Sequence, residues 1–176
     1  MKKLAWSMAA GLGLLAGTTL FADEKMDMKP YVGSAQFEKI KKLAGKWEGT
    51  SKMGNEDMKV SVDYRVTSGG SAVMETLSPG TSHEMVSLYH DKAGKLFMTH
   101  YCMLGNQPEL ELKNIDNGRM NFESSAQTRA DLKGQMYMNS LALEQLDKNQ
   151  LVQTWTAVNA DGKPLDSSVF TLKKKS

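Results

Sequence analysis

Cysteine is almost absent from this sequence, because Cys102 is the only one and no disulfide can form within the chain. Histidine is scarce as well, with His83, His90 and His100 and none after position 100. The nucleophile elbow Gly-x-Ser-x-Gly, the glycine-rich phosphate loop, the His-Glu-x-x-His helix and the Cys-x-x-Cys pair are all missing. No catalytic residue is therefore predicted, and the sequence favours a binding protein over an enzyme.

An excess of one charge is missing once the N-terminal segment is set aside. The chain has 22 Lys and Arg against 20 Asp and Glu, and the surplus lies at Lys2 and Lys3. Residues 23–176 are neutral, with one short basic cluster at 173–175. Nucleic-acid binding requires a basic stripe or patch, so we expect no nucleic-acid partner.

A long apolar run occurs only at the N-terminus. Lys2 and Lys3 precede the apolar residues 4–20, and Ala22 is a small residue at the position where a signal would be cut. This predicts a cleaved signal peptide over residues 1–22, although a retained anchor is the alternative because the run approaches spanning length. We expect an exported protein, periplasmic or secreted, with no membrane association after cleavage. The short signal and the missing disulfides favour a bacterium.

The remaining chain predicts one domain. Residues 23–33 are polar and read as a flexible lead-in, and residues 34–176 form the domain. Ser34 is a typical N-cap, and apolar residues at helical spacing follow it up to Leu43, where Gly45 would end the helix. We expect a helix of about three turns whose apolar side packs on the rest of the domain.

After Gly45 the pattern changes to alternation of apolar and polar residues, which is typical of half-buried strands. Asn117-Gly118 is a strong hairpin signal. We predict an all-β, antiparallel up-and-down barrel of about ten strands, closed because closure removes unpaired edges, with the helix capping one end. An outer-membrane barrel is not favoured, because mean hydropathy is −0.43 and several strands carry alternating charge. The strands are expected at 46–53, 60–66, 72–77, 84–90, 96–102, 109–115, 119–124, 136–146, 151–158 and 165–172.

Three segments carry a family resemblance. Gly45-Lys46-Trp47 resembles the Gly-x-Trp signature of the calycins, the lipocalin-like barrels. The longer stretch 43–49 looks like the start of nitrobindin-type barrels, and residues 99–108 resemble a segment of uncharacterised exported bacterial proteins with that barrel. The resemblance implies that Gly45 and Trp47 form the base of the barrel, and that Trp47 packs against a basic residue after the last strand, here Lys173 or Lys174.

The resemblance also bears on haem. Nitrobindin-type barrels that bind haem use a His from the C-terminal part of the barrel, and this chain has no His after His100. No cofactor is predicted, and haem is not expected.

His83, His90, His100 and Cys102 fall within twenty residues, which raises the question of a metal site. If residues 92–94 form the loop of a hairpin, His90 and His100 lie about four residues apart along the ladder, roughly 13 Å. That separation is too large for ligands of one ion, so no metal site is predicted.

The densest group of polar recognition residues is formed by His100, Tyr101, Cys102, Asn106 and Gln107. These are the predicted ligand-binding residues, although Asn106 and Gln107 would serve equally well to staple a loop. Methionine is frequent, with 13 residues, and flexible thioethers suit a cavity for apolar ligands. The sequence thus favours binding of a small apolar ligand inside the barrel.

Two alternatives remain open at this stage. One is a redox or other activity centred on His100 and Cys102, and the other is a solid barrel with a structural or interaction role. The face of strand 96–102 that points inward tests the redox alternative, because an inward His100 and Cys102 favour binding or redox chemistry, whereas an inward Thr99 and Tyr101 would place His100 on the surface. A solid barrel would instead have an interior volume too small for a ligand. Ligand identity and oligomeric state do not follow from the sequence.

Overall fold

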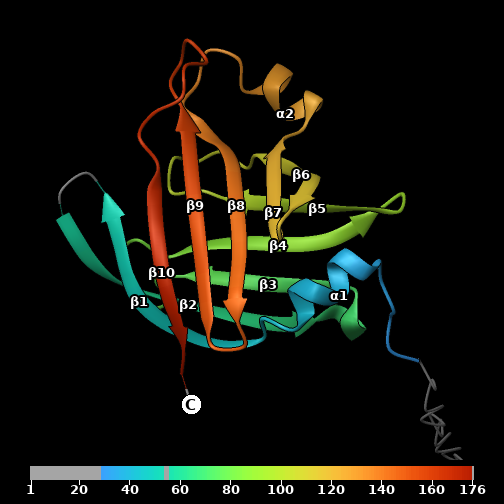
Figure 1. The fold of residues 1–176 in the computed structure, drawn as a ribbon. Coiled ribbons are helices and arrows are strands. Elements are labelled where there is room, and N and C mark those ends of the chain that lie inside the picture. Colours follow the sequence, from blue (N-terminus) through green and yellow to red (C-terminus); the bar gives the residue numbers. More distant parts are fainter. Residues whose placement is uncertain (1–28, 54–55, 176) are drawn as a thin grey trace, which may run out of the picture.

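The computed structural model describes residues 29–53 and 56–175, so the predicted signal peptide and residues 23–28 of the lead-in lie outside the described residues. The described chain forms one closed antiparallel barrel, in which consecutive strands pair and the first strand pairs with the last (Figure 1). The predicted all-β up-and-down barrel is confirmed. The ten strands are β1 (Gly45–Met53), β2 (Glu56–Thr67), β3 (Ala72–Leu77), β4 (Met85–Lys92), β5 (Lys95–Tyr101), β6 (Glu109–Asp116), β7 (Arg119–Ser124), β8 (Tyr137–Asp147), β9 (Gln150–Val158) and β10 (Ser168–Lys174).

The N-terminal helix α1 (Ala35–Lys41) is shorter than predicted, with seven residues in place of about three turns. Ser34 caps it as expected, because its hydroxyl accepts a hydrogen bond from the Phe37 amide at 3.1 Å. The helix ends early because Leu43 and the residue after it bond three positions back, which is a tighter turn than an α-helix. Gly45 has φ of 125° and begins β1 rather than capping the helix.

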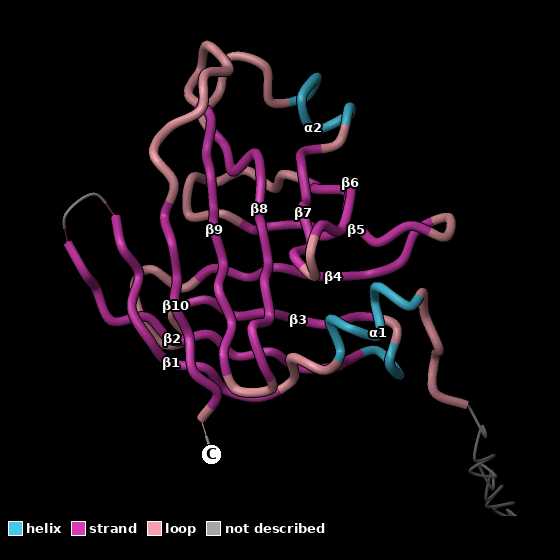
Figure 2. Tube along the Cα trace, in the orientation of Figure 1, coloured by secondary structure: helices cyan, strands magenta, loops and turns pink. Residues whose placement is uncertain are grey.

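A second short helix, α2 (Ala126–Asp131), joins β7 to β8 and was not predicted. Figure 2 shows it at the top of the view, well separated from α1 at the lower right. The turn between β2 and β3 contains a short 3-10 segment, η1 (Ser68–Gly70). In the part of the chain that the structure describes, none of the helices is both long and apolar enough to cross a membrane.

The helix α1 fills one end of the barrel. Phe37, Ile40 and Leu43 are at most 1% exposed and belong to the same core cluster as Trp47 at the start of β1. The Trp47 indole N–H donates to the Leu43 carbonyl at 2.8 Å, and the Lys174 ammonium lies 5.3 Å from the centre of its ring. Of the two basic residues considered for this contact, Lys174 is the one that makes it.

The hairpin between β4 and β5 corrects a sequence prediction. The loop is two residues long, Ala93-Gly94, and not 92–94, because Ala93 adopts the left-handed conformation (φ 51°) together with Gly94 (φ 76°). Such a turn matches the right-handed twist of the strands, and this favours it despite the Ala93 side chain. The register therefore shifts by one residue, and His100 lies opposite Ser87.

The barrel closes where β1 meets β10, with residues 47–52 opposite 169–174. Gly49 makes this seam tight, because a Cβ atom on it would lie 1.9 Å from the Thr171 carbonyl oxygen. Only glycine allows the two backbones to approach this closely. We call this pairing the β1–β10 seam.

Candidate functional site

A cavity of about 560 Å³ opens at the barrel end opposite α1. Its walls come from the ends of β1, β3, β5 and β9 and the starts of β2, β4, β8 and β10, away from Trp47. The lining is mainly apolar, and five of its large apolar side chains are exposed at the mouth. This exposed ring consists of Met58, Met103, Leu104, Met136 and Leu165.

Two of the predicted ligand-binding residues line the cavity. His100 is 1% exposed and Cys102, a free cysteine, is 9% exposed, and both face into the barrel. His100 lies on β5 and Cys102 directly follows the end of this strand, and their alternate positions place both side chains on the same face. His100 and Cys102 therefore point into the barrel, and this is the orientation that favours a binding or redox role.

The other three predicted residues have different positions. Tyr101 is 45% exposed and points to the outside of the wall, as its place between two inward residues requires. Asn106 is buried and donates to the Met136 carbonyl at 2.9 Å, and exposed Gln107 donates to the Gly105 carbonyl at 3.2 Å. Both amide side chains thus hold the loop after β5, which is the stapling role considered from the sequence.

Behind the cavity, polar side chains form a row across four neighbouring strands. Tyr64 on β2 lies opposite Glu75 on β3, Glu75 opposite Ser87 on β4, and Ser87 opposite His100 on β5. Residues directly opposite each other share a face, so all four side chains point into the barrel. All are buried, with exposed fractions of 1% or less.

Glu75 is the centre of this polar row. Its Oε1 accepts hydrogen bonds from the Tyr64 hydroxyl and from Nε2 of Gln153, both at 2.6 Å. Its Oε2 accepts from the Tyr89 hydroxyl at 3.0 Å. A buried carboxyl group is costly unless it is hydrogen-bonded, and this one has partners from β2, β4 and β9. The network therefore ties opposite walls of the barrel together.

The environment of Glu75 shifts several pKa values. Burial raises the pKa of Glu75 above its ordinary value, while hydrogen bonds from Tyr64, Gln153, Tyr89 and Ser87 act in the opposite direction. Burial also raises the pKa of Tyr64 and of Tyr89 well above the ordinary value, and the nearby Glu75 carboxyl adds to this. Both phenols consequently remain protonated donors.

His100 connects the polar row to the cavity. Its Nδ1 lies 3.0 Å from the Ser87 hydroxyl, and its ring centre is 4.9 Å from that of Trp155, which also lines the cavity. Its other nitrogen, Nε2, is buried and has no hydrogen-bond partner among the described residues. Burial lowers the pKa of His100 to about 4, so the ring is neutral at pH 7.

The polar row was not predicted, although the sequence contains a signal for it. Glu75 lies between Val73 and Leu77 at the apolar phase of β3, and Gln153 lies between Leu151 and Trp155 on β9. A polar residue at the inward phase of an alternating strand indicates a buried polar group.

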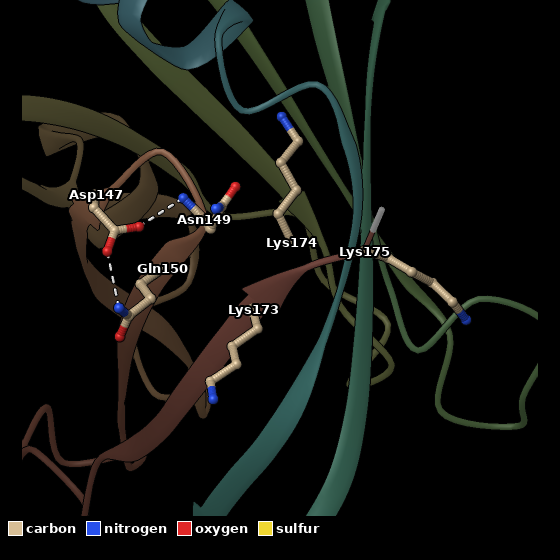
Figure 3. Close-up of a pocket in the computed structure, with 6 residues that line it drawn as sticks. All are labelled: Asp147, Asn149, Gln150, Lys173, Lys174 and Lys175. Carbon is tan, nitrogen blue, oxygen red and sulfur yellow. Dashed lines mark hydrogen bonds between the residues drawn. The ribbon is translucent and has the colours of Figure 1, made fainter.

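A second depression, of about 430 Å³, lies beside the β8–β9 turn and the end of β10. Figure 3 shows the Asp147 carboxylate bonded to the Asn149 amide and the Gln150 side chain, while the ammonium groups of residues 173–175 point in different directions. These cations do not converge on one point. Within residues 29–53 and 56–175, no three His, Cys, Asp or Glu side chains are grouped so that they could hold a metal ion.

Comparisons with known proteins place the fold but not the function. A scan against protein-family models finds no match, and a search of curated proteins finds none either. A solved structure of similar fold is that of a DUF3598-family protein of unknown function from Nostoc punctiforme PCC 73102, with a TM-score of 0.55 at 14% identity. The match covers 77% of this chain and 49% of the other, so this chain spans about half the length of that protein. At this identity the likeness shows the fold alone.

Proposed function

We propose that this protein is an exported, calycin-like barrel that binds a small, largely apolar molecule in the cavity lined by His100 and Cys102. The observation that carries the proposal is the cavity itself, about 560 Å³ with mainly apolar walls. Sites for small molecules typically measure about 300–1,000 Å³ and combine apolar walls with a few polar groups. A solid barrel with only a structural role would not leave such a space.

The lining of the cavity supports an apolar ligand. Met85 and Met138 lie in its wall, and Met58, Met103 and Met136 lie at its exposed mouth. Thioether side chains are flexible and polarisable, so they adapt to apolar ligands of varied shape. The same cavity is lined by these exposed methionines and by buried His100.

The test uses residues 23–176 and the neutral fluorescent probe N-phenyl-1-naphthylamine. We expect the probe to bind the wild-type protein, and Ala157→Trp to abolish binding because Ala157 lines the cavity and the indole fills it. Thr156→Trp is the matched control, because the Thr156 side chain faces away from the cavity and its hydroxyl contacts that of Ser167 on the exposed side. Equal binding by both variants, with unchanged circular dichroism, would contradict the proposal.

Native mass spectrometry of the full chain expressed in its own host gives a second test. We expect a protein mass that lacks residues 1–22 and an additional mass from a co-purifying small molecule. A mass that retains residues 1–22 would overturn the cleaved signal, and a ligand-free mass together with no probe binding would overturn the binding role.

Thiol chemistry at Cys102 is the second candidate function, because Cys102 and His100 line the same cavity. Cys102→Ser separates the two functions. A binding role predicts unchanged probe affinity and no change in peroxide consumption, whereas a redox role predicts loss of peroxide consumption in the variant.

A further inference from the structure

The buried Nε2 atom of His100 is the feature of the cavity that the proposed function leaves unexplained. Buried polar atoms in proteins almost always have a hydrogen-bond partner, because an unpaired one costs free energy. His100 lines the cavity, and its Nδ1 is already engaged by Ser87 on the side of the polar row. The two ring nitrogens point away from each other, so Nε2 is the atom available to a ligand.

The His100 tautomer depends on Ser87 and Glu75, and the hydrogen bonds that begin at Trp155 show that Glu75 acts as an acceptor. An indole N–H can only donate, and it contacts Oε1 of Gln153 at 3.0 Å, so this atom is the amide oxygen. Nε2 of Gln153 then spends its two protons on the Tyr64 hydroxyl and on Glu75, both at 2.6 Å. Tyr64 accepts from Gln153 and donates its own proton to Glu75.

Ser87 lies between Glu75 and His100. It lies directly opposite Glu75 in the ladder and on the same inward face, so its hydroxyl stands between the Glu75 carboxyl and Nδ1 of His100, which is 3.0 Å away. A serine hydroxyl has one proton, and a carboxylate is a stronger acceptor than a neutral ring nitrogen, which favours donation to Glu75 and leaves the Ser87 oxygen to accept from His100. Nδ1 of His100 then carries the ring proton, and Nε2 has a bare lone pair that can only accept.

We propose that the ligand presents a hydrogen-bond donor, a hydroxyl or a neutral N–H, to Nε2 of His100 at the inner end of the cavity. This proposal rests on the proposed function and names its ligand class: a mainly apolar molecule with one donor. Ethers, ketones and esters of the same shape cannot satisfy Nε2, and carboxylates would bring a negative charge towards Glu75. Phenols and alcohols fit the site.

The experiment compares 4-butylphenol with 4-butylanisole, in which O–CH₃ replaces the O–H group. We expect isothermal titration calorimetry on residues 23–176 to give about 3- to 10-fold tighter binding of the phenol, as one hydrogen bond would supply. In His100→Phe the phenol and the ether should bind about equally tightly. The preference should persist in His90→Phe, the matched control, because His90 lies outside the cavity and stacks on Phe97 with ring centres 6.3 Å apart.

A measurement on the unaltered His100 keeps the proposal testable if His100→Phe fails to fold. In a variant with His83 and His90 replaced by Gln, ¹⁵N NMR of the single remaining imidazole reports which nitrogen is protonated. A protonated Nδ1 and a bare Nε2 support the proposal, and a protonated Nε2 overturns it.

The outcomes separate the two proposals. If the ether binds as tightly as the phenol, or if the preference survives in His100→Phe, the donor proposal fails while cavity binding stands. If neither compound binds, and N-phenyl-1-naphthylamine does not bind either, the proposed function fails and the donor proposal fails with it.

Discussion

Two tryptophans occupy opposite ends of this barrel in similar local settings. Trp47 and Trp155 are 0% and 3% exposed, and each donates its indole N–H, to the Leu43 carbonyl at 2.8 Å and to Gln153 Oε1 at 3.0 Å. Their neighbours differ. Trp47 is covered by α1 and by the Lys174 ammonium, whereas Trp155 faces His100 and the cavity.

The difference shows that the barrel interior is packed at one end and hollow at the other. At the α1 end, apolar side chains fill the space around Trp47, and such packing supports stability. At the open end, about 560 Å³ is left beside Trp155, which costs the side chains that line it part of their packing contacts. Substitutions at the α1 end should therefore change stability, and substitutions at the open end should change binding.

The largest expected effect tests this division directly. We expect Trp47→Ala to lower the free energy of unfolding by about 3–5 kcal/mol, because it removes a fully enclosed indole. Trp155→Ala should cost at least about 1 kcal/mol less, because its side chain already borders a cavity and makes fewer contacts. Urea unfolding monitored by circular dichroism measures both, and equal losses would remove the distinction between the two ends.

The second prediction concerns pH and the open end. The pKa of His100 is about 4 in the folded protein against 6.5 ordinarily, so below pH 6.5 the unfolded chain binds a proton that the folded one excludes. The contribution of neutral His100 to the free energy of unfolding is therefore fully present above pH 6.5, and it is lost as pH falls to about 4. At 1.36 kcal/mol per pH unit, the loss approaches about 3 kcal/mol. Urea titrations at intervals from pH 7 to 4 measure it.

His100→Phe is the comparison for the pH experiment. Glu75, whose pKa is raised, lowers stability as pH rises above its unfolded value, but it does so in both proteins. The difference between wild type and variant therefore isolates His100. A wild-type curve parallel to that of the variant would show that His100 is not buried in its neutral form.

The smallest expected effect returns to the α1 end. Lys174→Met keeps the side-chain stem over Trp47 and removes the charge, so we expect a loss of about 0.5–1 kcal/mol from the cation–π contact. Lys173→Met, at the exposed neighbouring position, should change stability by less than about 0.5 kcal/mol. Identical unfolding midpoints for the two variants would mean that the ammonium over Trp47 adds nothing to stability.

Much of the fold could be predicted because strand alternation is a strong local signal. The predicted strands 72–77 and 119–124 match β3 and β7 residue for residue, and the other eight differ by a few residues at their ends. The helix α2 has no such signal, because six residues after Ser125 are mainly polar and only Thr128 is buried. Its start depends on the Ser125 cap, a cue that is easily missed in a short segment.

The site was less predictable for a different reason. His100 and Cys102 could be placed on one face from their spacing, but the partner of His100 depended on the β4–β5 register. That register turned on Ala93 adopting a positive φ, which glycine adopts freely and alanine rarely does. The observed register differs from the predicted one by one residue, so Ser87 and not Val86 lies opposite His100. The polar row depends on this pairing.

The β1–β10 seam has a consequence for the order of folding. Every other strand pair joins neighbours along the chain, so its hairpin can form without closing a long loop. The seam joins Trp47 to Lys174, across almost the whole domain, and the entropy lost in closing a loop grows with its length. We therefore expect the barrel to assemble as an open sheet that closes last at this seam, where Gly49 allows the two backbones to meet.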